Sequence, residues 1–483
     1  MVFPIVGGDG KPTGYDVENS ARFFSNTDLK RLPSATGSSL RGTLSVWVKF
    51  ADDTSTMAII GGWDNSGAND DDGYMVFKRL NSGELQFRGG DDVYLTSNSQ
   101  FYDLSAWYHI VLAIDSAQNS NNAQRIYVNG QELTDFATRN NLTNLQDLPM
   151  NTTAGNDDAL LIGCDEDTGG KGNHFHGYMS EFFWIDGTQY AASNFGETND
   201  DGIWIPKNGE DIVDDLTMGT NGVYLEFKQT GTSANSSGIG ADTSGNGNHF
   251  AVNNIGSNQP TIDTPTNNYC VLNQLYRATT GSTARPTITG GNLSVARVAD
   301  SSTQSTFGMA NGKWYFEVRY NSGQVDGYPQ IGYSKSGGIN AGEMVGFHTP
   351  SGSNYRAKIA GTVVSNAFSG GISSNDILGF YMDIDNGTLI VHKNGSDFMG
   401  SGASSGLDFS SASFSNDTGF FHVHYNTNAN SAHSEDFNFG GAITFTVSSS
   451  NADANGHGKF EYSPTLSGTN YYALNSKNLA EFG

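Results

Sequence analysis

The chain has 483 residues, and 50 acidic against 25 basic residues give it a formal net charge of −25. This charge argues against nucleic acid as a partner, because phosphate binding needs a basic surface. Glycine (61 residues) and aromatic side chains (12%) are abundant, which is typical of many short strands and tight turns and not of a disordered chain.

Residues 1–14 predict an N-terminal arm, since they contain glycine and proline and carry only a small apolar group. This segment has neither the charged start nor the long apolar run of a secretory signal. No run approaches the roughly 18 apolar residues of a membrane span, so we expect no membrane insertion. The sequence does not decide whether Cys164 and Cys270 form a disulfide, but we favour two reduced thiols in a protein assembled in a reducing cytoplasm.

Residues 15–207 predict one all-β domain. Short segments with alternating or continuous apolar residues are bounded by turn residues, and none has the sustained period of a helix. The expected strands are 44–50, 57–63, 74–80, 84–88, 107–115, 125–129, 160–163 and 178–186. Residues 208–285 are acidic at first and then rich in glycine and serine, which predicts a bridging region with little core of its own and with one strand, 222–228.

Residues 286–450 predict a second all-β domain, and residues 451–483 predict a C-terminal tail. The last part of this tail, 471–483, favours a short helix. The expected strands of the second domain are 313–320, 330–334, 344–348, 356–364, 378–385, 388–393, 420–425 and 436–439.

A hairpin in residues 376–395 (DILGFYMDIDNGTLIVHKNG) decides the fold class. Asn386-Gly387 predicts a two-residue type I′ turn, because both central positions of that turn require positive φ. The register that follows has two apolar pairs on one face, Ile384 with Leu389 and Met382 with Val391. Such a face must be buried against another sheet. Because residues 107–130 contain a similar pair of strands, we expect two antiparallel β-sandwiches joined by an extended bridge.

Several segments resemble known families. Residues 15–207 resemble a laminin-G-like, concanavalin A-like sandwich in WYHIVLAID…RIYVNG and LLIG…FHGYMSEFFWIDG. The second domain resembles a SPRY domain in GKWYFEVRY, QIGYS and the 376–395 hairpin. This order of domains, with FGETNDDGIWIPK, GADTSGNGNHFAVNNI, DTPTNNY and YALNSKNLAEFG, is similar to tail-fibre or lectin-domain proteins of tailed phages, especially marine ones. The resemblance implies a virion surface protein that is assembled in the host cytoplasm, and analogy with virion appendages implies a homotrimer.

A sugar site needs an exposed aromatic face beside carboxylates or amides. Trp63 ends an expected strand and is followed by Asp64 and Asn65, as in a lectin loop. Four side chains on expected loops or strand ends of the second domain are further candidate contacts, with an ordinary surface residue as the alternative at each position: Tyr328, His348, Tyr355 and Arg356.

Two oxygen-rich loops are candidate Ca²⁺ sites. The first resembles the DxSGNGN loop of laminin-G-like domains, where oxygen ligands can hold calcium, and the alternative is an Asx-turn loop without metal. The candidate ligands in this loop are Asp242, Ser244, Asn246 and Asn248. The second candidate comprises Asp70, Asp71 and Asp72, with a solvated acidic turn as its alternative.

The sequence has no P-loop, HExxH or CxxC motif and no Glu-x-Asp-x-x-Glu glycosidase signature. It also has no GxSxG nucleophile elbow, which requires that motif at a turn from a strand to a helix. Asp383 and Asp385 share a strand face, but their place beside a turn explains them more simply. We therefore expect a non-catalytic appendage of a phage virion that binds glycans on the host cell surface and assembles with other virion proteins. A structural decoration subunit without receptor binding and a glycan-degrading tail protein are the alternatives.

Overall fold

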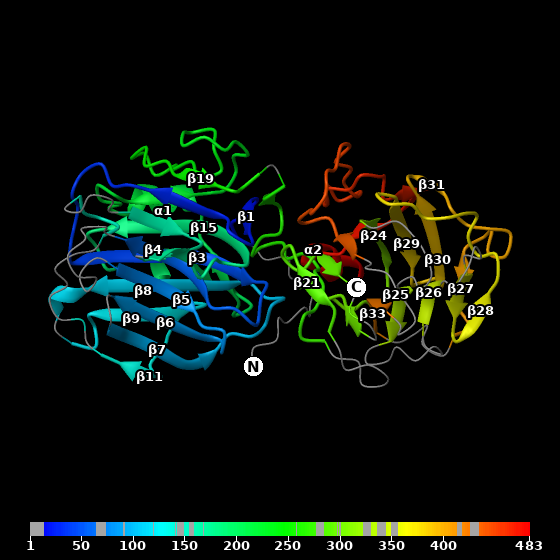
Figure 1. The fold of residues 1–483 in the computed structure, drawn as a ribbon, viewed down its shortest axis with the longest axis horizontal. Coiled ribbons are helices and arrows are strands. Elements are labelled where there is room, and N and C mark those ends of the chain that lie inside the picture. The colour runs from blue at the N-terminus through cyan, green and yellow to red at the C-terminus, as the bar shows by residue number, and fades with distance from the viewer. Residues whose placement is uncertain are drawn as a thin grey trace. The chain divides into compact units, whose positions relative to one another are not determined.

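The computed structural model describes residues 14–483 apart from 64–73, 90–91, 119, 141, 143–148, 154–158, 168, 257, 277–284, 297, 299–300, 322–329, 336–343, 349–355, 413–417 and 426–433. The chain divides into two units between Asn267 and Asn268. Each unit consists mainly of antiparallel strands (Figure 1).

The first unit contains two sheets, each with eight strands among the described residues. The first sheet runs in the order β10 (Gln131–Glu132), β9 (Gln124–Val128), β8 (Tyr108–Asp115), β3 (Arg41–Phe50), β15 (Gly177–Asp186), β1 (Ser20–Phe23) and β20 (Pro260–Thr261), with β18 (Val223–Leu225) paired to β15. The second runs in the order β11 (Phe136–Arg139), β7 (Asp92–Gln100), β6 (Glu84–Gly89), β5 (Tyr74–Arg79), β4 (Met57–Trp63), β12 (Ala159–Ile162), β2 (Asp28–Arg31) and β19 (Ala251–Asn253).

Smaller elements complete the first unit. They are the hairpins β13 (Asp165–Asp167)–β14 (Gly170–Gly172) and β16 (Gly196–Thr198)–β17 (Trp204–Pro206), the 3₁₀ helices Ser116–Gln118 and Ala192–Asn194, and helix α1 (Gly209–Asp215).

The core of the first unit lies between its two large sheets. Val46 and Ile110, which are directly paired on β3 and β8, belong to the same buried cluster as Phe77 and Phe87 of the second sheet. Side chains alternate along a strand, so the neighbours of these residues point to the outer faces of the sheets. Burying each such side chain contributes roughly 1.5–3 kcal/mol, and this core therefore holds the two sheets together.

The second unit pairs a nine-stranded sheet with a six-stranded one, counted over the described residues. The first has the order β21 (Thr287–Thr289), β22 (Ser294–Ala296), β34 (Ser434–Asn438), β24 (Lys313–Tyr320), β29 (Ile377–Asp383), β30 (Thr388–Lys393) and β31 (Ser396–Asp397), with β32 (Leu407–Asp408) on β30 and β37 (Tyr472–Ala473) parallel to β24. The second has the order β23 (Ser301–Gln304), β33 (Gly419–Tyr425), β25 (Gln330–Lys335), β26 (Met344–His348), β27 (Arg356–Ile359) and β28 (Thr362–Val364).

Aromatic rings fill the core of the second unit. Phe316 stacks on Phe380 with 4.7 Å between ring centroids, and its centroid lies 4.1 Å from that of Phe421 on the other sheet. A small hairpin, β35 (Thr465–Leu466)–β36 (Thr469–Asn470), and helix α2 (Ser476–Phe482) follow these sheets in the chain. The predicted all-β class with two antiparallel sandwiches is thus confirmed, as is the short C-terminal helix.

The expected bridge is part of the first sandwich. Strands β18, β19 and β20 all lie within the predicted bridging region 208–285, and they extend both sheets of the first unit. Helix α1 also forms there, where a loop was expected. Its N-cap is Asn208, whose side chain accepts a hydrogen bond from the backbone N–H of Glu210. The acidic residues in the first turn stabilise the helix by interacting with the positive end of its dipole.

The hairpin between β29 and β30 has a different turn from the one predicted. Asp383 pairs with Thr388, so the loop has four residues and Met382 lies opposite Leu389. Of the expected turn pair only Gly387 has positive φ (+65°), whereas a type I′ turn needs two such residues. Asp383 accepts hydrogen bonds from the backbone and side chain of Asn386, and this capping holds the wider loop. The register moves by two residues, so the apolar face is kept.

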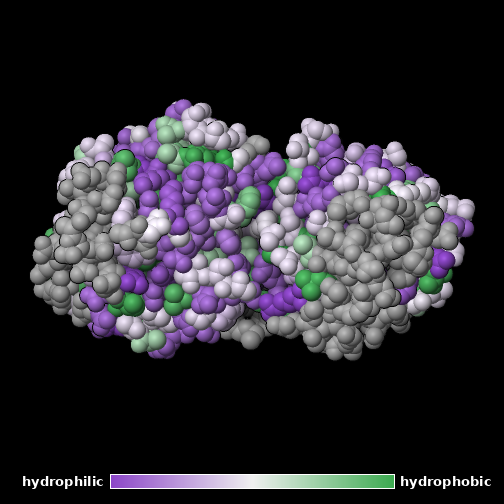
Figure 2. All heavy atoms as spheres, viewed as in Figure 1, coloured by the Kyte–Doolittle hydropathy of each residue, from purple (hydrophilic) through white to green (hydrophobic). Residues whose placement is uncertain are grey.

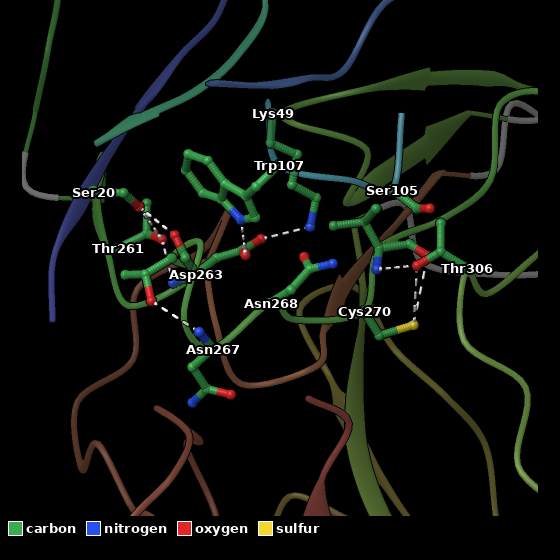
Figure 3. Close-up of polar contacts among 12 residues, drawn as sticks. Ser20, Lys49, Ser105, Trp107, Thr261, Asp263, Asn267, Asn268, Cys270 and Thr306 are labelled. Atoms are coloured by element: carbon green, nitrogen blue, oxygen red, sulfur yellow. Dashed lines mark hydrogen bonds and ion pairs between the residues drawn. The ribbon is translucent and has the colours of Figure 1, made fainter. Parts of the chain in front are cut away.

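A buried polar network fastens residues 261–267 to the first sandwich (Figure 3). Asp263 Oδ2 lies 2.9 Å from Lys49 Nζ, and both side chains are only 1% exposed. The indole nitrogen of Trp107 donates a hydrogen bond to Asp263 Oδ1 at 3.1 Å. Ser20 donates to the carbonyl oxygen of Asp263 from the neighbouring strand β1. Because each buried charge needs its partner, this network fixes the end of the unit to its sheets.

Glu181 is a buried acid in a strained position of β15. The pairing of β15 with β3 is irregular between Ser180 and Phe183, and Glu181 has φ of +48° there. Its carboxylate is 5% exposed and accepts a hydrogen bond from the Tyr224 hydroxyl at 2.7 Å. Burial raises the pKa of Glu181 from 4.5 to about 8, against the opposing effect of that hydrogen bond.

This acid makes the stability of the first unit depend on pH. A folded pKa above the unfolded value means that the contribution of Glu181 is fully present below pH 4.5 and is lost as pH rises through about 8. We expect the free energy of unfolding of Glu181→Gln, relative to wild type, to rise between pH 4.5 and pH 9 by an amount on the order of 4 kcal/mol. Urea unfolding of both proteins across this range measures it. An unchanged difference between them would contradict the assignment.

Candidate functional site

The outer side of the second sheet of the first unit carries a group of polar and aromatic side chains. Met75 and Phe77 of β5 point into the core, so Tyr74 and Lys78 point outward. The alternation on β6 likewise places Arg88 on the outer side, because Phe87 is in the core. The sequence-predicted Trp63 lies at the end of the adjacent strand β4 and is paired with Tyr74.

Trp63 does not present the exposed ring that a lectin loop requires. Its side chain is 7% exposed and packs with Ala159, Leu161 and Cys164. The reason is its place in the sheet: β4 has a partner strand on each side, so Trp63 lies between Tyr74 of β5 and Ala159 of β12. Asp64 and Asn65, the other predicted members of this site, lie outside the described residues.

Tyr74 is instead the half-exposed aromatic residue at this position, and hydrogen bonds orient its ring. The Tyr74 hydroxyl donates to Asp165 Oδ2 at 2.8 Å, and the Asn173 side chain donates to the same oxygen at 2.7 Å. The Arg88 guanidinium lies 5.8 Å from the centre of the Tyr74 ring. We call Tyr74, Arg88, Asp165 and Asn173 the Tyr74 cluster. The Asp165 carboxylate is 5% exposed and orients Tyr74 and Asn173. The surface of the cluster thus offers an aromatic face, an amide and a guanidinium, which are groups that fix a polar ligand.

Most predicted contacts of the second unit lie outside the described residues, namely Tyr328, Tyr355 and the side chain of His348. Arg356 is half-buried on β27, and it is directly paired with His348 of β26. The structure therefore brings the backbones of these two candidates together.

The carboxylate of Asp242 is occupied by the backbone of its own loop and of β18. Its Oδ1 accepts hydrogen bonds from the N–H groups of Tyr224 at 3.0 Å and Ser244 at 2.9 Å. Its Oδ2 accepts from the N–H of Asn248 at 2.7 Å. Asp242 is 6% exposed, so these bonds are shielded from water. They form the Asx-turn arrangement that the sequence left open as the alternative to a metal site.

The other predicted ligands of this loop face the carbonyl oxygen of Gly222. Asn246 and Asn248 donate their amide hydrogens to it at 2.9 and 3.0 Å, and Ser244 donates its hydroxyl hydrogen at 3.4 Å. Calcium binding needs several oxygens turned toward one point. In this loop both carboxylate oxygens of Asp242 accept backbone N–H groups, and the other three side chains turn hydrogens toward Gly222, so the donor set does not fit a cation. Asp70, Asp71 and Asp72 lie outside the described residues.

A second loop of the same construction occurs in the second unit and was missed from the sequence. Asp453 Oδ1 accepts from the N–H groups of Asn455 and His457, both at 2.9 Å. Its Oδ2 accepts from the N–H of Ala473 at 2.9 Å and from the Asn478 side chain at 2.8 Å. These bonds join two parts of the segment predicted as the C-terminal tail: the loop that contains Asp453 and the stretch with β37 and α2.

The signal for this repetition is visible in the letters ADTSGNGNHF (241–250) and ADANGHGKF (452–460). Both loops have two glycines with positive φ, which are Gly245 and Gly247 in the first and Gly456 and Gly458 in the second. Each loop leads to a fully buried phenylalanine, Phe250 or Phe460. The motif therefore occurs twice in the chain with the same structural role, in which an aspartate carboxylate holds the loop backbone by hydrogen bonds.

Asp383 and Asp385 have structural roles at the β29–β30 turn, which is the explanation that the sequence analysis preferred over a catalytic pair. Asp383 Oδ2 lies 2.5 Å from Lys313 Nζ, and Asp385 Oδ1 accepts from the N–H of Gly312 at 2.7 Å. Burial raises the pKa of Asp383, but hydrogen bonds from Lys313 and Asn386 outweigh it and hold the pKa below its usual value. Two carboxylates in these roles do not resemble the acid and nucleophile of a glycosidase.

The described residues include no helix of sufficient length and apolarity to cross a membrane. Cys164 and Cys270 are both buried, and the two thiols are not joined in a disulfide. On the face drawn in Figure 2, hydrophilic residues cover most of the described surface and hydrophobic ones form small patches.

Comparison with known proteins bears on the first unit. The concanavalin A-like lectin/glucanases superfamily matches residues 24–189. This match lies within the predicted sandwich 15–207 and covers most of the strands of both large sheets. No curated protein matches the chain.

Solved structures similar to the chain are distant. They include a proposed carbohydrate binding protein from Bacteroides ovatus (16% identity, TM-score 0.32, covering 50% of this chain and 59% of that one), so the chain spans less than two thirds of that protein. Domains LG4-5 of the mouse laminin alpha1 chain (9%, 0.30, 88% and 87%) and the TRIM65 PSpry domain (12%, 0.26, 35% and 88%) are also similar.

Proposed function

We propose that this protein binds glycans on a cell surface without cleaving them, and that it does so as an appendage of a phage virion. The observation that carries the glycan-binding part is the match of residues 24–189 to a superfamily of lectins and glucanases. The Tyr74 cluster supports a site on this sandwich, because Asp165 orients an aromatic ring that lies beside an amide and a guanidinium.

The non-catalytic part is supported by the roles of the carboxylates. A retaining or inverting glycosidase needs two acids that converge on one substrate bond. Within the described residues, the acids that looked most like such a pair, Asp383 and Asp385, are bound to Lys313 and Gly312 in a turn. The virion part rests on the resemblance of the linking motifs to phage appendage proteins, and so does the expected homotrimer.

Substitutions in the Tyr74 cluster test the proposed site. We expect Tyr74→Ala and Arg88→Ala each to weaken glycan binding at least about tenfold, since each removes contact area or a charged donor from the ligand. An array of bacterial surface polysaccharides, probed with the labelled full chain, gives the ligand and the affinities. Tyr102→Ala and Arg125→Ala are matched controls, because these side chains are exposed or half-exposed elsewhere on the same unit.

Other outcomes would favour other functions. Binding that is equal in all four variants would place the glycan site elsewhere on the chain. Absence of binding to every polysaccharide, together with incorporation into particles, would favour a decoration subunit. Release of new reducing ends from a bound polysaccharide would favour a glycan-degrading tail protein.

A further inference from the structure

Three side chains with different metal-binding atoms meet beside the second sheet of the first unit. Asp28 lies on β2, Cys164 lies between β12 and β13, and His174 follows β14. One carboxylate oxygen, the thiol sulfur and one ring nitrogen all lie within 4.8 Å of one another. Asp28 and Cys164 are fully buried, and His174 is half-buried.

Two of these three side chains, His174 and Cys164, have a possible ligand atom with no hydrogen bond or disulfide among the described residues. The Nδ1 atom of His174 is buried and lacks a hydrogen-bond partner there. The thiol of Cys164 is buried and is not part of a disulfide. A buried ring nitrogen without a partner costs free energy that a bound cation recovers.

We propose that Asp28, Cys164 and His174 form a binding site for a transition-metal cation, with Zn²⁺ as the best fit. Zinc takes thiolate, imidazole and carboxylate ligands in tetrahedral sites, with ligand distances of roughly 2.0–2.3 Å. Such distances hold ligand atoms roughly 3.5 Å apart, so small side-chain rotations close the site. Calcium is a poor fit, since it takes oxygen ligands. This proposal is independent of glycan binding.

Lys171 competes with a metal ion for the Asp28 carboxylate. Its ammonium group pairs with Asp28 Oδ1, while the Asn253 side chain donates to Asp28 Oδ2 at 2.7 Å. The Lys171 side chain is 25% exposed, so its charged end can turn to solvent when a cation enters. Asn253 then remains as the group that orients the carboxylate. Removal of the Lys171 charge should therefore strengthen metal binding, whereas removal of a ligand should weaken it.

Cobalt and zinc titrations of the reduced, metal-free full chain test the site. We expect Co²⁺ to produce the near-ultraviolet thiolate-to-cobalt band and the strong visible bands of a tetrahedral site, and Zn²⁺ to abolish both. Cys164→Ser should lose the thiolate band, and His174→Gln should weaken zinc at least about tenfold in chelator competition. Lys171→Gln should bind zinc several-fold more tightly. Cys270→Ser and His176→Gln should match wild type, since they change the other thiol and a neighbouring histidine.

Thermal unfolding of each metal-free variant separates loss of the site from loss of the fold. A wild-type chain that binds Co²⁺ without a thiolate band would overturn the proposal. A thiolate band that persists in Cys164→Ser but disappears in Cys270→Ser would overturn it as well. Zinc affinity that is unchanged in His174→Gln and in Lys171→Gln would show that the cluster only fills the core, and the proposal would then be wrong.

Discussion

Replacing Asp263 with alanine is expected to destabilise the first unit by about 3–5 kcal/mol, which corresponds to a fall of roughly 10 °C in its Tm. The substitution removes the ion pair between Asp263 and the Lys49 ammonium group, whose side chain is 1% exposed, and it also removes the acceptor of the Trp107 indole. A buried charge without a partner is among the most destabilising changes in a protein. Urea and thermal unfolding of the full chain measure the effect.

A surface ion pair of the same unit provides the control. Arg41 Nε lies 3.0 Å from Asp115, but the Arg41 side chain is 46% exposed. Arg41→Ala should therefore cost no more than about 1 kcal/mol. The double variant Lys49→Met with Asp263→Leu should recover much of the stability, because it removes both buried charges. A loss for Asp263→Ala no larger than that for Arg41→Ala would show that the network does not hold the unit together.

Replacing Asp242 with alanine should cost about 3 kcal/mol, since three backbone N–H groups lose their acceptor in a buried loop. Asp242→Asn should cost less, because it keeps one acceptor oxygen. Unfolding of the wild type and both variants is measured in calcium and in EGTA. Asp201→Ala, at an exposed carboxylate, serves as the control and should stay within about 0.5 kcal/mol of wild type.

The calcium arm of this experiment decides between the two interpretations of the loop. The hydrogen bonds described above predict that the loss caused by Asp242→Ala is the same in calcium and in EGTA. If calcium stabilised the wild type and this gain disappeared in Asp242→Ala, the loop would be a calcium site and the structural interpretation would be wrong.

The fold was predictable from the sequence where strands are long and turns are local. The strands at Met57–Trp63, Lys313–Tyr320 and Thr388–Lys393 have the expected bounds. Asn129-Gly130 and Asn394-Gly395 both have two positive φ values and form two-residue hairpin turns. Asn386-Gly387 has the same letters but a different turn, because Asp383 binds Asn386. The Asn-Gly dipeptide therefore predicts a two-residue turn correctly unless a neighbouring side chain makes a competing hydrogen bond to the turn backbone.

The site was harder to predict, because exposure depends on contacts that are distant in the sequence. Trp63 ends its strand as expected, but pairing with Tyr74 and Ala159 buries it. In 208–267 the strand expected at 222–228 is present as β18, whereas β19 and β20 are only two or three residues long and form by pairing with β2 and β1. No local periodicity reports such pairing.

The motifs that carry the resemblance to phage proteins have structural roles. DTPTNNY contains Asp263 of the buried network, and GADTSGNGNHF is the Asp242 loop. In FGETNDDGIWIPK, the Trp204 indole donates to the buried His109 at 3.0 Å and stacks on its ring. These residues hold strands together, so their resemblance marks shared architecture more directly than a shared ligand.

Binding of the labelled full chain to intact host cells, before and after periodate oxidation of their surface glycans, tests the proposed function most directly. The account predicts saturable binding that virions compete for and that periodate abolishes, with no sugar released into the medium. Binding that survives periodate treatment, or no binding at any concentration of the assembled protein, would contradict it.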